Sequence, residues 1–113
     1  MKLYEIVNSL SLEVKTHSPD LNKEVTGGYV SDLLSDVIGN SKKGNVWITL
    51  QTHQNIIAVA TLRDMSGIIL VNGRNPDADT LLKADEQGIP LMVSSLPAFE
   101  LVGRLYSLGI RCQ

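Results

Sequence analysis

A threonine and two glycines, Thr26-Gly27-Gly28, are the residues of this chain best suited to bind a ligand through the backbone. They separate a short predicted strand, residues 22–26, from a helical pattern that begins at Tyr29 or Val30. Apolar side chains recur there at i, i+3, i+4, i+7 and i+8, one face of an α-helix. Glycines at such a junction allow a sharp turn and leave N–H groups uncovered at a helix N-terminus, where anions are favoured. The triplet therefore predicts a turn that can accept an anion.

Three more loops follow predicted strands, and they are also small or polar. Ligands of open α/β sheets bind outside the carboxyl ends of the parallel strands, so we expect these four loops to meet there. His53 and Arg74 can supply positive charge, which predicts a cleft for a nucleotide or another anion. Turn and N-cap chemistry, which requires the same residue types, is the competing explanation. The candidate ligand-binding residues are Thr26, Gly27, Gly28, Thr52, His53, Asn72, Arg74, Ser94 and Ser95.

Catalytic machinery has little support in the sequence. Nothing matches G-x-x-x-x-G-K-[ST] or G-x-G-x-x-G, so phosphoryl transfer lacks its usual charge-neutralising groups. His53 has no orienting carboxylate nearby in the sequence, and Asp32 and Asp36 are expected on the polar face of their helix. The single cysteine, Cys112, permits neither an intrachain disulfide nor a cysteine-rich metal site. We expect no catalytic residue, no metal and no cofactor.

Length and composition indicate one ordinary domain. The chain has 113 residues, of which 43% are hydrophobic and 19% charged, so we expect a single domain over residues 1–113. A formal net charge of −2, with no basic run longer than Lys42-Lys43, argues against nucleic-acid binding. The N-terminus lacks a signal-peptide pattern, and no apolar stretch approaches the roughly 20 residues that span a bilayer. We therefore expect a cytoplasmic protein with no membrane partner.

Hydrophobic periodicity predicts alternating strands and helices. The predicted helices are residues 1–10, 29–38, 53–63, 76–87 and 97–108; the predicted strands are 12–16, 22–26, 46–50, 67–71 and 89–94. The run 53–63 is apolar nearly all round and fits a buried strand or a helix, but its length and Thr52 as N-cap favour a helix. Strand–helix units from residue 46 onward need crossover connections. We therefore predict a three-layer α/β/α fold whose mainly parallel, mixed sheet has about five strands, with 12–16 antiparallel at an edge.

From about Leu12 to Ile110 the chain resembles the DRTGG domain family. The matching segments are Val25-Thr26-Gly27-Gly28, residues 67–73 and residues 88–91. Glu24 and Val25 stand where the family name would place Asp and Arg, so an anion-pairing role for that Arg does not carry over. The family is similar to the N-terminal domain of HPr kinase/phosphorylase and occurs in phosphotransacetylases and pyrophosphatases. The resemblance implies an α/β/α fold and a non-catalytic regulatory or dimerising module.

Three functions follow as hypotheses. The first is a regulatory or protein-interaction module that self-associates as a homodimer and modulates a metabolic partner protein, with Tyr4, Trp47 and Tyr106 as candidates for the interface. The second is a small-ligand sensor that binds a nucleotide or another anion at the four loops. The third, an enzyme, is disfavoured because no acid–base or nucleophile pair can be assembled.

Overall fold

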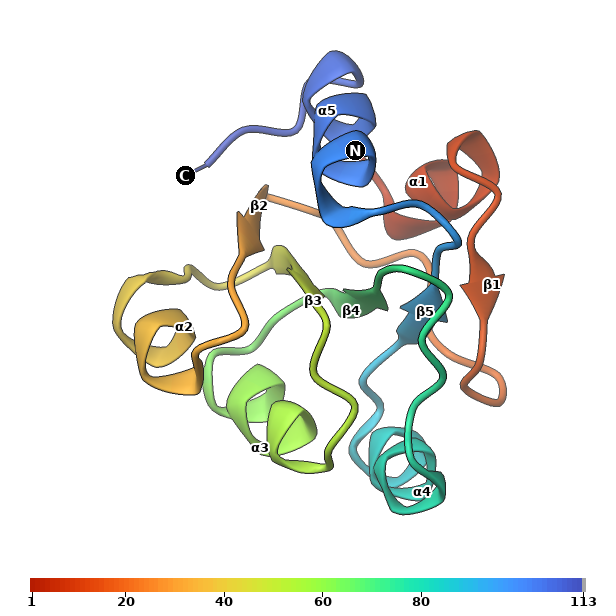
Figure 1. Cartoon of the computed structure of the whole chain (residues 1–113), viewed down its shortest axis with the longest axis vertical. Coiled ribbons are helices and arrows are strands. Elements are labelled where there is room, and N and C mark those ends of the chain that lie inside the picture. The colour runs from red at the N-terminus through yellow and green to blue at the C-terminus, as the bar shows by residue number, and fades with distance from the viewer. Residues whose placement is uncertain (113) are drawn as a thin grey trace.

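The computed structural model describes residues 1–112, in which five helices surround a five-stranded sheet (Figure 1). The strands are β1 (Glu13–Val14), β2 (Gly27–Val30), β3 (Asn45–Thr49), β4 (Gly67–Leu70) and β5 (Leu91–Val93). The helices are α1 (Leu3–Ser9), α2 (Leu34–Asn40), α3 (Asn55–Leu62), α4 (Ala78–Gln87) and α5 (Ala98–Ser107). No helix among these residues is long and apolar enough to cross a membrane.

The sheet is mixed, with the strand order β1-β5-β4-β3-β2. Strands β2 to β5 pair in parallel because a helix carries the chain back between each of them. Strand β1 pairs antiparallel with β5, with Glu13 opposite Val93 and Val14 opposite Met92. The predicted fold class and the antiparallel edge strand are confirmed.

Helices cover both faces of the sheet and create two cores (Figure 1). Alternate residues of a strand point to opposite faces, so Val46 and Ile48 join one core and Trp47 joins the other. Buried residues of α1 and α5 complete the first core, and those of α2, α3 and α4 complete the second. The long apolar run of α3 is helical as predicted, with Ile56, Ile57, Val59 and Ala60 buried.

The first strand–helix unit differs from the prediction. Gly27–Val30 forms the strand that was expected at residues 22–26, and α2 begins only at Leu34. Tyr29 pairs with Trp47 and Val30 with Ile48, so hydrogen bonding to β3 overrides the helical spacing of the apolar side chains. Gly39, expected to follow the helix, lies inside α2.

Helix α4 also begins two residues later than predicted. The helix was expected to begin at residue 76, but Asp77 is its N-cap and its first residue is Ala78. Its backbone N–H donates to the carbonyl oxygen of Thr52 at 3.2 Å, and Thr80 Oγ1 donates to the same oxygen at 2.6 Å. Contacts with the loop before α3 therefore fix where α4 begins, whereas its predicted end at the left-handed Gly88 is confirmed.

Candidate functional site

Thr26-Gly27-Gly28 lies at the amino end of the parallel strands, not at the carboxyl end. Gly27 pairs with Asn45, the first residue of β3, so the prediction that the triplet follows a strand and opens a helix is wrong. Thr26 Oγ1 donates to the Lys43 carbonyl at 2.8 Å, and the Thr26 N–H donates to the Gly44 carbonyl at 3.0 Å. Gly44 has φ +83°, and a Cβ there would lie 2.6 Å from Thr26 Cγ2. The hydrogen bonds of Thr26 thus stabilise the turn before β3.

Gly28 holds the C-terminal tail. Its backbone N–H donates to the Arg111 carbonyl at 3.0 Å, and a Cβ on Gly28 would lie 3.2 Å from Ile110 Cγ2. The amide that was expected to face an anion therefore already has an acceptor within the chain, and the missing side chain makes room for the tail.

Asp32 takes the place at the carboxyl end of the sheet that was expected for the glycines. Its Oδ1 accepts hydrogen bonds from Thr49 Oγ1 at 2.8 Å and from the Leu50 N–H at 2.7 Å, and its carbonyl accepts one from Gln51 Nε2 at 3.0 Å. Asp32 precedes α2, so its expected place on the polar face of a helix is wrong. A carboxylate here opposes anion binding because like charges repel.

The other predicted loops do meet at this end, where they bond to each other. The Gly73 N–H donates to the Ser94 carbonyl at 2.8 Å, and the Asn72 N–H donates to the Leu96 carbonyl at 2.9 Å. His53 Nδ1 accepts from the backbone of Asn55 at 3.1 Å. Most of their polar groups therefore close turns, as the competing explanation requires.

Three of the predicted residues leave exposed polar side chains at this end. Asn72, Arg74 and Ser95 are exposed, and none of their side chains forms a hydrogen bond to another of the described residues. The structure thus brings Thr52, His53, Asn72, Arg74, Ser94 and Ser95 to one end and Thr26-Gly27-Gly28 to the other. Ligand binding at the six carboxyl-end residues stays a prediction. Within residues 1–112, no three His, Cys, Asp or Glu side chains are grouped as metal ligands.

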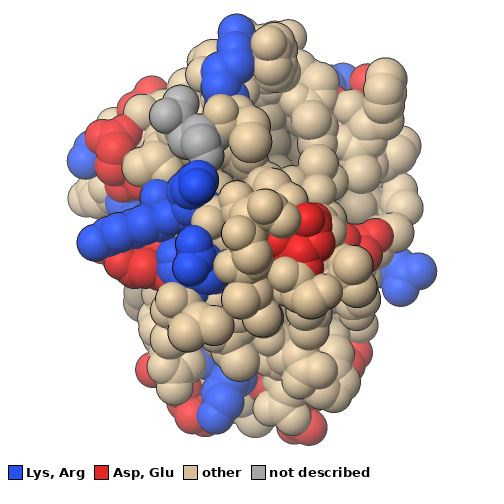
Figure 2. All heavy atoms as spheres, turned by 90° about the vertical axis from the view of Figure 1, so that its left-hand side faces the viewer, with Lys and Arg blue, Asp and Glu red and all other residues tan. Residues whose placement is uncertain are grey.

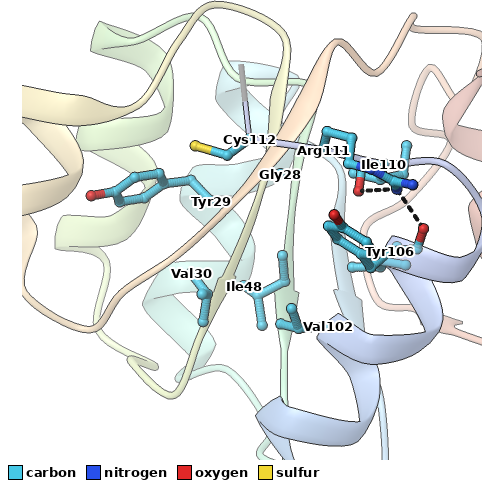
Figure 3. Close-up of a pocket in the computed structure, with 10 residues that line it drawn as sticks. Gly28, Tyr29, Val30, Ile48, Val102, Tyr106, Ile110, Arg111 and Cys112 are labelled. Carbon is cyan, nitrogen blue, oxygen red and sulfur yellow. Dashed lines mark hydrogen bonds between the residues drawn. The ribbon is translucent and has the colours of Figure 1, made fainter.

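A cavity of about 300 Å³ opens between β2 and α5, and we call it the β2–α5 groove (Figure 3). Its walls are mainly apolar, with Val30 and Ile48 from the sheet and Val102 and Leu105 from α5. The tail residues 110–112 complete it, and none of the residues that line it is acidic. No sequence pattern indicated this site, because Val102 and Leu105 fit an ordinary buried helix face.

A cation and an aromatic ring stand together at the wall of this groove. The Arg111 guanidinium carbon lies 3.7 Å from the centroid of the Tyr106 ring, a cation–π contact. Arg111 Nη1 also donates to the Tyr106 carbonyl at 2.6 Å, which holds the tail against the end of α5 (Figure 3). Tyr106 and Arg111, five residues apart in the sequence, therefore give the groove an aromatic ring and a positive charge.

Asp36 joins α2 to the edge strand β2. The Tyr29 hydroxyl lies 2.9 Å from both carboxylate oxygens, and Asn40 Nδ2 donates to Oδ1 at 2.9 Å. Hydrogen bonds from the side chains of Ser31, Tyr29 and Asn40 lower the pKa of Asp36, and burial partly opposes them. The same contact raises the pKa of Tyr29. The cluster stabilises the ionised form of Asp36, as expected of a structural anchor.

Comparison with known proteins identifies the fold. No family model and no curated protein match the chain. Its structure is similar to that of the CBS and DRTGG domains of the regulatory region of the Clostridium perfringens pyrophosphatase, in complex with the activator diadenosine tetraphosphate. The TM-score is 0.75 and the identity 17%, over 98% of this chain and 48% of that chain. The chain therefore spans about half the length of this neighbour, and at this identity the likeness shows a shared fold.

Proposed function

We propose that this chain is a DRTGG-like, non-catalytic regulatory module that self-associates and modulates a metabolic partner protein. The fold of the neighbour, which belongs to the regulatory region of an enzyme, supports this assignment. The loops at the carboxyl end of the sheet support it too, since their polar groups mostly bond to one another instead of forming an acid–base pair.

The proposed self-association rests on the exposure of large aromatic side chains on α5. Phe99 is 90% exposed and Tyr106, seven residues later and thus on a similar side of the helix, is 59% exposed. Single exposed aliphatic residues are common, but a nearly fully exposed phenylalanine on the same helix as an exposed tyrosine is typical of an interface. Trp47, an earlier candidate, is fully buried and donates its Nε1 hydrogen to the Ser31 carbonyl, so it cannot contact a partner.

Sedimentation velocity over a series of micromolar concentrations tests self-association. We expect the sedimentation coefficient to rise with concentration toward that of a dimer. A monomer at every concentration would remove the support for this function.

A ligand sensor is the second candidate, and the β2–α5 groove favours it. The groove is at the small end of the volumes that ligand pockets have, and it offers a guanidinium on an aromatic ring with no acidic lining residue. The neighbour is described in complex with a nucleotide activator. A nucleotide, with its flat base and anionic phosphates, matches these features of the groove.

Thermal denaturation with ATP and with diadenosine tetraphosphate tests the sensor. We expect a nucleotide to raise the melting temperature of the wild type and of Arg74→Ala, but not of Arg111→Ala. Loss of the effect in Arg74→Ala alone would place binding at the carboxyl end of the sheet. No shift with either nucleotide would count against a nucleotide sensor.

A further inference from the structure

Gly103 occupies the middle of α5, on the side turned away from the sheet. Glycine destabilises a helix interior relative to alanine. A Cβ at Gly103 would meet nothing within 4 Å, whereas a Cβ at Gly28 would lie 3.2 Å from a neighbour. Packing inside the chain therefore does not require glycine at 103. A bare backbone there leaves room for a second molecule to approach the helix closely.

Phe99 and a second groove lie along the same side of α5. A depression of about 320 Å³ runs between Phe99 and Leu108, where α5 passes the end of α1, and we call it the α1–α5 groove. Leu10 and Leu108 give it apolar walls, and Gly103 and Ser107 leave it open. The helix thus carries an exposed aromatic side chain at the edge of a partly apolar recess that Gly103 also lines.

We propose that two copies of this chain pack α5 against α5, antiparallel, about a two-fold axis at Gly103. Phe99 is four residues before Gly103 and Ser107 four residues after it, so the antiparallel arrangement brings Phe99 of one copy to the level of Ser107 of the other. Each Phe99 then enters the α1–α5 groove of the opposite copy, and the contact is self-complementary. This inference rests on the proposed self-association and specifies its interface.

Charge complementarity identifies a second copy as the occupant. Glu100 and Arg104 are exposed along the α1–α5 groove, and neither forms an ion pair within residues 1–112. In the antiparallel pair, Glu100 of one copy and Arg104 of the other differ by about 3 Å along the helix axes. The two-fold axis repeats this attraction, whereas parallel helices in register would place Glu100 beside Glu100.

Two substitutions test the interface in the full chain by sedimentation equilibrium. We expect Phe99→Ala to weaken the dimer at least about tenfold, because buried aromatic anchors dominate interfaces. We expect Gly103→Ala to weaken the dimer while raising the urea midpoint of the dilute monomer, since the new methyl separates the helices but favours each one. Gly39→Ala in α2, where a Cβ also meets nothing within 4 Å, is the matched control and leaves the dimer unchanged.

Charge reversal tests whether the two α5 helices of the dimer are antiparallel. Glu100→Arg and Arg104→Glu each weaken the dimer, and the double variant restores it, because every attraction is re-formed with exchanged signs. A wild type that stays monomeric would overturn both the proposed self-association and this interface. A dimer that persists in Phe99→Ala and in Gly103→Ala would overturn the interface alone and leave self-association standing.

Discussion

The carboxyl end of the sheet and the surface around α5 differ in how they use their residues. At the carboxyl end, small polar residues are abundant, and most of them bond to one another, as Asp32 does with Thr49 and Leu50. Around α5, few residues suggest chemistry, yet two grooves, a highly exposed phenylalanine and a glycine that packing inside the chain does not require lie there. Figure 2, which views the side of the molecule with β2, α2 and the tail, shows a largely uncharged surface with acidic groups near its middle and a cluster of basic groups to their left.

Residue type alone therefore does not show which polar groups remain free to bind a ligand. A hydroxyl or amide that closes a loop has already used its hydrogen-bonding capacity, and only the structure reveals this. An apolar side chain without internal neighbours is the more informative observation, because burying it against a partner gains free energy.

The largest expected effect concerns the attachment of α5. Leu105 is 3% exposed, belongs to the core and lines the β2–α5 groove. We expect Leu105→Ala to lower the free energy of unfolding by about 2–5 kcal/mol, because it removes buried methyl groups and leaves a cavity. Urea denaturation measures this, and Leu62→Ala, at an exposed leucine of α3, is the control with little change. Equal losses in both variants would show that α5 is not anchored as described.

Substitutions of Asp32 test whether its hydrogen bonds stabilise the carboxyl end of the sheet. Asp32→Ala leaves the Leu50 N–H and the Thr49 hydroxyl without their acceptor, and we expect a loss of about 1–3 kcal/mol in the free energy of unfolding. Asp32→Asn keeps an acceptor oxygen and is expected to lose less. If urea denaturation found the two variants equally stable, the hydrogen bonds would not be what holds this end together.

A substitution of Thr80 tests the hydrogen bonding at the carboxyl end of the sheet by removing a single bond. Its hydroxyl is buried and donates to the Thr52 carbonyl at 2.6 Å, so Thr80→Val is expected to lower the free energy of unfolding by about 1 kcal/mol. Thr61→Val removes a similar bond, from Thr61 Oγ1 to the Ile57 carbonyl at 2.8 Å, on an exposed side of α3. Thermal or urea denaturation should rank Thr80→Val as the less stable variant, and the reverse order would contradict this account.

The smallest expected effect is a pH dependence at the junction of β2 and α2. Hydrogen bonds lower the pKa of Asp36 in the folded chain. The ionised carboxylate therefore stabilises the fold at pH values above the pKa that Asp36 has in the unfolded chain. That stability is lost as the pH falls through the lowered folded value, so urea midpoints should decline below about pH 4. Asp36→Asn should show a shallower decline over this range, and parallel curves would exclude the contribution of Asp36.

Much of the fold could be predicted from the sequence where a local pattern and the tertiary environment agree. The apolar, β-branched runs of β3 and β4 are buried on both faces, and α5 begins after a proline as its pattern indicates. The failure at β2 has a physical reason: Val30 fits a helical face by its spacing, but its backbone pairs with β3 beside Ile48. Spacing within a segment cannot show which distant strand competes for it.

The sequence by itself determined the fold class, the mixed and mainly parallel sheet and its antiparallel edge strand, because hydrophobic periodicity and crossover geometry act locally. Only the tertiary structure decided that Thr26-Gly27-Gly28 lies at the amino end, that Asp32 closes the carboxyl end and that Arg111 stacks on Tyr106. These facts depend on which hydrogen-bond partners and packing neighbours the folded chain brings together. The exposure of Phe99 is of the same kind, since a side chain is bare only when no other part of the chain covers it.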